Sequence, residues 1–277
     1  MEHAIVIQDV TKRFRETVAV SHVTACFETG KIHGIIGRNG SGKTVLFKCI
    51  CGLFPVTEGS IEVLGQRMGD GKRVPKGVGA IIETPGFLPN CSGYQNLRYL
   101  MELSGKANRE RIRWAMATVG LDPDSKKHVG KYSLGMRQRL GLAQAMMEDP
   151  ELLILDEPMN GLDKGGVAEM RELFLKLKEQ GKTILIAEHR LYYLMDIADR
   201  IVYLDRGEIK GIFTPEEFRR LSQAKREQMG LRATDLMDVL PLPSRAPVRG
   251  SVLSLKNVSL HYKKRTILHG IGLSAAR

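Results

Sequence analysis

The stretch GRNGSGKT, residues 37 to 44, has the residue types and the spacing needed to hold a phosphate chain. It matches the pattern G-x-x-x-x-G-K-S/T, follows a short apolar run that is typical of a buried strand, and precedes an apolar-rich segment of helical character. Glycines let such a loop wrap around phosphates, so that backbone N–H groups and the next helix N-terminus face the anion. The residues expected in this cradle are Gly37, Arg38, Asn39, Gly40, Ser41, Gly42, Lys43 and Thr44.

Four side chains are expected to act on that phosphate chain. Lys43 should reach the β- and γ-phosphates of ATP, and the Thr44 hydroxyl should coordinate Mg²⁺. A second apolar strand, in ELLILDEP, ends in Asp156 and Glu157, and the carboxyl ends of parallel strands are where α/β sheets bind ligands. Asp156 should hold Mg²⁺, directly or through water, and Glu157 should polarise the water that attacks the γ-phosphate.

Five further stretches resemble the ATP-binding cassette (ABC) family of transporter ATPases, over roughly residues 4 to 212. The resemblance implies that Phe14 stacks on adenine. The string YSLGMRQRLGLAQAM, residues 132 to 146, resembles the family signature, usually L-S-G-G-Q. Ser133 and Gly135 match it, whereas Leu134 and Met136 depart from it. In this family the signature of one subunit contacts the γ-phosphate held by the other, which implies a dimer.

The roles of the other three stretches are also implied by the resemblance. PMNGLD ends in Asp163 and resembles the loop that couples the two sites, and TILIAEH ends in His189, whose family counterpart contacts the γ-phosphate. In IIETPGF, Glu83 stands where the family usually has a glutamine that touches Mg²⁺ and the attacking water and contacts the membrane partner. An ionised glutamate accepts hydrogen bonds but cannot donate them. Hydrolysis is expected to survive, since Glu157 is present.

The expected fold is an α/β P-loop ATPase core with an antiparallel β-subdomain and an inserted helical subdomain. Residues 4 to 30 should form the antiparallel layer around adenine, and residues 31 to 80 and 151 to 212 the parallel core. Residues 92 to 147 should form the helical subdomain that meets a membrane partner. The domains are expected at 1–212 for nucleotide binding, 213–250 for a helix and a Pro-rich linker, and 251–277 for a truncated start of a second cassette.

The segment after residue 213 carries clear local signals. Thr214 and Glu217 form a capping box, Pro215 suits the first helical position, and Gly230 suits the far end. PLPSRAPVRG, residues 241 to 250, is typical of an extended linker.

The last segment repeats the first. With a shift of 248 residues, Val258 falls on Val10, Tyr262 on Phe14 and Ile271 on Val23, without a gap. The shifted phosphate loop would begin beyond Arg277, so residues 251 to 277 are interpreted as a second cassette cut off before that loop. An unrelated β-hairpin extension is the alternative.

Two subfamily resemblances compete. IIETPGFLPN and the signature-to-PMNGLD region resemble export and immunity cassettes of the bacitracin-resistance type, whereas AEHRLYYLMDIADRIVYLDRGEI and the segments after it resemble tandem ATPases of energy-coupling-factor vitamin importers. A join near residues 183 to 189 would explain both, and the transported substrate stays open.

Composition limits the function classes. No apolar run could span a bilayer and no signal peptide is visible, so we expect a cytoplasmic protein on the inner face of the cell membrane, with a separate permease and a second cassette as partners. The net charge of +11 is scattered, without the interleaved aromatics of a nucleic-acid surface, and no specific nucleic acid is expected. The four cysteines are expected to be free thiols. Two alternatives stay open: a soluble tandem-cassette translation factor acting on ribosomes, and a non-catalytic regulatory fragment.

Overall fold

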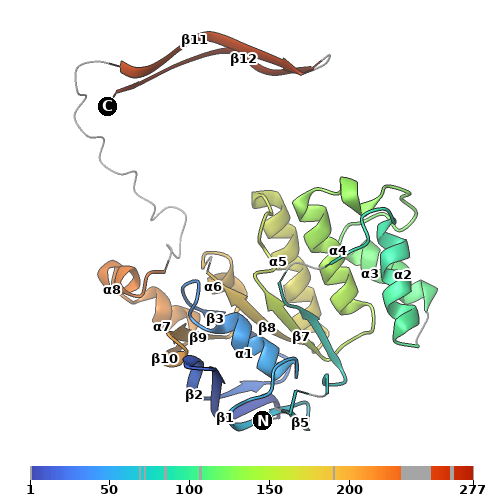
Figure 1. Cartoon of the computed structure of the whole chain (residues 1–277), viewed down its shortest axis with the longest axis vertical. Helices are drawn as coiled ribbons and strands as arrows, with labels where there is room; N and C mark the ends of the chain where they lie inside the picture. The colour runs from blue at the N-terminus through green and yellow to red at the C-terminus, as the bar shows by residue number, and fades with distance from the viewer. Residues whose placement is uncertain are drawn as a thin grey trace. The chain divides into compact units, whose positions relative to one another are not determined.

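The computed structural model describes residues 2–68, 70–71, 73–83, 86–105, 108–189, 191–231, 251–262 and 265–276. The chain divides into two compact units, Met1–Leu236 and Met237–Arg277 (Figure 1). The linker expected at residues 241 to 250 lies outside the described residues.

A six-stranded, mostly parallel sheet forms the centre of the first unit, in the order β10-β9-β3-β8-β7-β6. Only the pair β9–β10 is antiparallel. Every residue of β3, β7 and β8 is buried, as expected for continuous apolar strands that are covered on both faces. The strands are β3 (Ile32–Ile36), β6 (Val78–Ile81), β7 (Leu152–Asp156), β8 (Thr183–Glu188), β9 (Arg200–Asp205) and β10 (Glu208–Phe213).

A second, antiparallel sheet has the order β2-β1-β4-β5, with β1 (His3–Phe14), β2 (Thr17–Glu28), β4 (Glu58–Val63) and β5 (Gln66–Met68). The layer expected at residues 4 to 30 is confirmed. The assignment of all of residues 31 to 80 to the parallel core is wrong, because β4 and β5 join the antiparallel sheet. A two-residue turn, Leu64 and Gly65, joins them, and both residues have positive φ, the backbone of a tight hairpin turn.

The helices predicted between residues 92 and 147 are confirmed as α2 (Gly93–Leu103), α3 (Arg109–Thr118) and α4 (Leu134–Met146), with a 3-10 turn η1 (Val129–Lys131) between α3 and α4. Ser92 and Gln95 form a capping box at the start of α2. These helices and α5 (Lys164–Glu179) lie together on one side of the parallel sheet's β7 end (Figure 1).

The chain after β10 stays packed on the core. The capping box of Thr214 and Glu217 and the first-turn Pro215 are confirmed at α7 (Pro215–Arg219). One helix was expected in this segment, but the structure has two. Ser222 accepts a hydrogen bond from the Lys225 N–H and so starts a second helix, α8 (Gln223–Gln228). Phe218 is fully buried and anchors the segment. A short α6 (Leu194–Ile197) precedes β9.

Two expectations from composition can be compared with the described residues. None of their helices combines the length and the apolar character that crossing a membrane requires. All four cysteines are free, with Cys49 and Cys51 buried and Cys26 and Cys91 half-buried.

A buried histidine on β3 makes the first unit sensitive to pH. His33 is fully buried, its Nε2 lies 2.9 Å from the Glu28 carbonyl oxygen, and its ring meets Phe27 edge-on at 5.2 Å. Burial lowers the pKa of His33 below its ordinary value of 6.5, against the smaller effect of the Glu28 carbonyl. The folded chain therefore holds this ring neutral at a pH where the unfolded chain protonates it.

We predict that the free energy of unfolding falls as the pH drops below about 6.5, by at most ~1.4 kcal/mol per pH unit from this residue. His33→Gln should flatten that slope in urea unfolding between pH 7.5 and 5.5. The control is His22→Gln. The hydrogen bond to Asp9 raises the pKa of the exposed His22, so His22 stabilises the fold at low pH. Replacing His22 should therefore steepen the fall of the unfolding free energy with decreasing pH. Equal slopes in wild type and His33→Gln would contradict the prediction.

Candidate nucleotide site

The phosphate loop lies between β3 and α1 (Lys43–Ile50). Gly42 caps the helix with φ of 102°, and a Cβ there would meet the Ala19 carbonyl oxygen, so the backbone approaches β2 more closely than a side chain allows. The Gly207 N–H donates to the Ser41 carbonyl at 2.9 Å and ties the loop to the β9–β10 turn. The phosphate loop before α1 is thus held from two sides, by β2 and by the β9–β10 turn.

Lys43 turns back over its own loop. Its Nζ donates to the carbonyl oxygens of Gly37 at 2.8 Å and Arg38 at 3.0 Å. The side chain is 5% exposed, and this burial lowers the pKa of Lys43, whereas the carboxylates of Glu157 and Asp156 oppose the shift. The ammonium is therefore positioned to contact an anion that occupies the loop.

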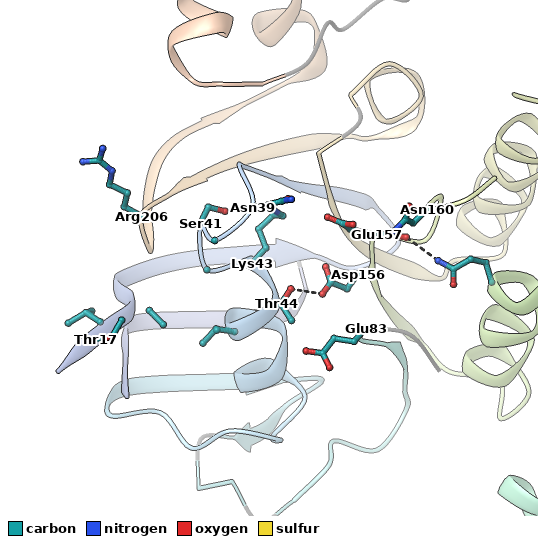
Figure 2. Close-up of a pocket in the computed structure, with 16 residues that line it drawn as sticks. Thr17, Asn39, Ser41, Lys43, Thr44, Glu83, Asp156, Glu157, Asn160 and Arg206 are labelled. Carbon is teal, nitrogen blue, oxygen red and sulfur yellow. Dashed lines mark hydrogen bonds between the residues drawn. The ribbon is translucent and has the colours of Figure 1, made fainter. Parts of the chain in front are cut away.

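A hydroxyl and a carboxylate meet beside that ammonium. Thr44 Oγ1 donates to Asp156 Oδ2 at 2.7 Å (Figure 2). Burial raises the pKa of Asp156, and the hydrogen bond from Thr44 opposes the shift. Hydroxyl and carboxylate oxygens are donors that Mg²⁺ prefers, and a cation between them would offset the burial of the carboxylate. The residues present fit a magnesium ion.

Glu157 follows β7 in a backbone conformation that is uncommon for its residue type, with φ of 49°. Its N–H donates to the Ala187 carbonyl at 2.9 Å, and its Oε1 lies 3.0 Å from His189 Nδ1. Gln138 of α4 donates from Nε2 to the Glu157 carbonyl at 3.4 Å. Neighbouring elements thus fix both the backbone and the carboxylate of Glu157.

Glu83 also has a positive φ (63°), and it lies on the side of Asp156 away from Glu157 (Figure 2). Its Oε1 is 2.6 Å from Lys48 Nζ, on the last turn of α1. The Lys48 ammonium also lies 5.3 Å from the centre of the Phe54 ring. A cation therefore balances the charge at the position where the sequence has glutamate in place of the usual glutamine.

These groups border one cavity of about 720 Å³ (Figure 2). Nine predicted residues line it: Asn39, Gly40, Ser41, Gly42, Lys43, Thr44, Glu83, Asp156 and Glu157. The prediction missed seven others, which are Thr17, Val18, Ala19, Val45, Gln138, Asn160 and Arg206. Asn160 lies in PMNGLD, three residues before the aspartate that was singled out, and Gln138 lies inside the signature string.

Seven predicted residues are absent from the lining given by the described part of the chain. Gly37 and Arg38 contribute their carbonyls to Lys43, and His189 contacts Glu157. Phe14 is 40% exposed and packs edge-on against Phe54 at 5.3 Å, so its ring does not line the cavity.

The remaining predicted residues line a different cavity, of about 530 Å³. Ser133 and Gly135 lie there with Asp163. Ser133 Oγ accepts from the Met136 N–H at 3.2 Å and caps α4, and Asp163 Oδ1 accepts from the Gly166 N–H at 2.8 Å and caps α5. Two helix N-termini therefore meet at this second cavity, where backbone N–H groups favour an anion. One chain keeps its phosphate loop and its signature in separate cavities.

Comparison with known proteins agrees with this geometry. A family model described as "ABC transporter" matches residues 20–160. The chain is 42% identical over 211 residues to the bacitracin transport ATP-binding protein BcrA of Enterococcus faecalis, covering 76% of this chain and 68% of the relative. It is 36% identical over 203 residues to the lantibiotic transport ATP-binding protein SrtF of Streptococcus pyogenes, covering 73% of this chain and 87% of the relative.

Solved structures share the fold. A nucleotide-free ATP-binding cassette from an ABC transporter superposes with a TM-score of 0.75 at 23% identity, covering 84% of this chain and all of that one. A dimeric cassette in a post-hydrolysis state bound to ADP and phosphate gives a TM-score of 0.68 at 22% identity, covering 76% of this chain and 98% of that one. With the phosphate loop, the paired carboxylates and the signature in place, the chain belongs to the ABC transporter family, as an ATP-binding and ATP-hydrolysing subunit.

Proposed function

We propose that this subunit hydrolyses Mg²⁺-bound ATP in a site completed by a second cassette, and that the cycle drives a separate membrane permease. The observation that carries the proposal is the separation of the two cavities on one chain. Lys43 and Glu157 border one of them, and Ser133 and Gly135 border the other. A second cassette facing the first would bring its signature cavity over the phosphate loop.

The roles of the residues follow from their contacts. The loop N–H groups and Lys43 would bind the phosphates, and bound Mg²⁺, held by Thr44 and Asp156, would supply charge neutralisation at the reacting phosphate. Glu157 would orient a water and take its proton, with His189 holding the carboxylate in place. Ser133, Gly135 and Asp163 would act on the partner's nucleotide.

Phe14 would contact adenine from the rim. Its neighbours Thr17 and Val18 line the cavity, so the end of the β1–β2 hairpin borders the position expected for the nucleoside. A nucleotide would then lie with its base toward this hairpin and its phosphates toward Lys43.

The relatives' names support the transport class. BcrA and SrtF, which are described as bacitracin and lantibiotic transport ATP-binding proteins, match this chain over 211 and 203 residues at 42% and 36% identity. We infer export of peptide antibiotics, from the cytoplasmic face of the membrane. The proposed domain for nucleotide binding is 1–212, followed by the packed helices α7 and α8 and the connecting residues to 250.

Mixing two inactive variants tests the shared site. Lys43→Ala removes the phosphate ligand, and Gly135→Asp places a negative charge at the signature. Each variant alone should lose turnover. A one-to-one mixture should recover about a quarter of the wild-type rate, because half of randomly paired dimers keep one intact site of two. No recovery would contradict a site shared between two copies.

Replacing the catalytic carboxylate separates binding from chemistry. Glu157→Gln should lower ATP turnover by about 10²-fold or more and leave ATP affinity within a few-fold, because the amide cannot accept the water's proton. Glu151→Gln, an exposed position at the opposite end of β7, is the matched control and should be unchanged. Unaltered turnover in Glu157→Gln would remove this residue from its proposed role.

The Lys48–Glu83 pair can be tested in ATP binding without metal. Lys48→Met leaves the Glu83 charge uncompensated beside Asp156, so ATP in EDTA should bind roughly fivefold more weakly, from about 1 kcal/mol of repulsion. Lys48→Met/Glu83→Gln should restore the affinity. Lys31→Met, which breaks the similar pair with Glu28 outside the cavity, is the control. If the double variant binds as weakly as the single one, charge compensation is not the role of Lys48.

A further inference from the structure

The described part of the second unit is a two-stranded hairpin, β11 (Ser251–Tyr262) and β12 (Arg265–Ala276), whose pairing repeats that of β1 and β2. The offset is 248 residues, as from Val10 to Val258, and it holds for every recorded pair of both hairpins. Interruptions of the ladder fall at the same places in both. The pairs in the first hairpin are His3 with Glu28, Ile5 with Phe27, Val6 with Cys26, Ile7 with Ala25, Val10 with Val23, Lys12 with Val20, Arg13 with Val18 and Phe14 with Thr17.

The irregular backbone is repeated as well. Asn257 has φ of 49°, equal to that of Asp9, and Gly270 has φ of 59° where His22 has 49°. Non-glycine residues seldom adopt this conformation, so its recurrence at Asn257 is specific, and Gly270 supplies a residue that adopts it without strain. Bulges of this kind re-aim strands and are features of a particular fold.

One side-chain hydrogen bond recurs at the same offset. In the first hairpin the His22 N–H donates to Thr11 Oγ1 at 3.1 Å, and in the second the Gly270 N–H donates to Ser259 Oγ at 3.0 Å. A hydroxyl residue thus stabilises the same bulge in both hairpins. An unrelated hairpin extension has no reason to repeat register, bulge and hydroxyl together.

The two hairpins differ in what covers them. Leu253, Leu268, Ile271 and Leu273 are between 40% and 53% exposed. At the offset positions Ile5, Val20, Val23 and Ala25 are at most 9% exposed, in the cluster that includes Ile35 of β3 and Leu46 and Phe47 of α1. The apolar row that the first hairpin buries on its phosphate-loop core is uncovered in the second.

We propose that residues 251–276 are the opening hairpin of a second nucleotide-binding domain, and that this apolar row packs on a phosphate-loop core of the kind formed by β3, α1 and β4. An isolated two-stranded hairpin is at best marginally stable in water, so the row requires a surface to pack on. The proposal rests on the proposed function only for the identity of that domain as a cassette.

A graft within the full chain tests the fit. Residues 3–28 are replaced by residues 251–276, a segment of the same length, so that the second hairpin must cover the first core. The grafted chain should unfold cooperatively in urea and bind a fluorescent ATP analogue within about tenfold of the parent chain. If the complete graft precipitates, a half graft that replaces β2 alone by β12 decides the question. Failure of both to fold overturns the proposal.

Point variants of the graft locate the contact. Leu268→Asp with Ile271→Asp should abolish cooperative unfolding, because both counterparts are buried. Lys256→Asp is the matched control and should change nothing, since its counterpart Gln8 is exposed. Equal tolerance of both changes would mean that the row does not face the core and would overturn the proposal. Absence of ATP binding by the parent chain, with normal unfolding of the graft, would instead contradict the proposed function alone.

Discussion

Three parallel strands that end at the same edge of one sheet determine the site. β3 and β7 both pair with β8, so the phosphate loop, the two carboxylates at the carboxyl end of β7 and the histidine after β8 must lie together. These strands are buried throughout, and apart from His33 of β3 their polar side chains stand at the strand ends. The sheet order brings together residues that are more than a hundred positions apart, such as Thr44 and Asp156.

That constraint explains which parts could be predicted from the sequence. The loop, the strand-end carboxylates and the helix caps depend on local patterns, and β3 and the capping box of Thr214 and Glu217 were identified correctly. The placement of β4 and β5 in the antiparallel sheet was missed, because the hairpin turn that joins them was not recognised in the sequence. Gln138 reaches the cavity because α4 packs against β6, a tertiary arrangement that no local pattern encodes. Asn160 lies on the loop that leaves β7, and its sequence carries no signal that separates it from its neighbours.

Two residues cap a helix and also border a cavity. Ser133 and Asp163 cap helices in the chain that carries them, and the same N-termini border the second cavity. In the proposed dimer, the hydrogen bonds that begin these helices would also orient the groups offered to a partner. Loss of a cap would disturb recognition and folding together, so the two effects need separate measurements.

The contacts of Lys43 bear on selectivity among anions. Two of the three N–H donors of its ammonium are held by carbonyl oxygens of its own loop, so the ammonium is oriented before an anion arrives. A small monovalent anion such as chloride would gain little beyond one hydrogen bond from the third donor, whereas a polyphosphate would add the loop's N–H groups to the same event. Such a loop would favour polyphosphates over abundant monovalent salts without any side chain that blocks the salts.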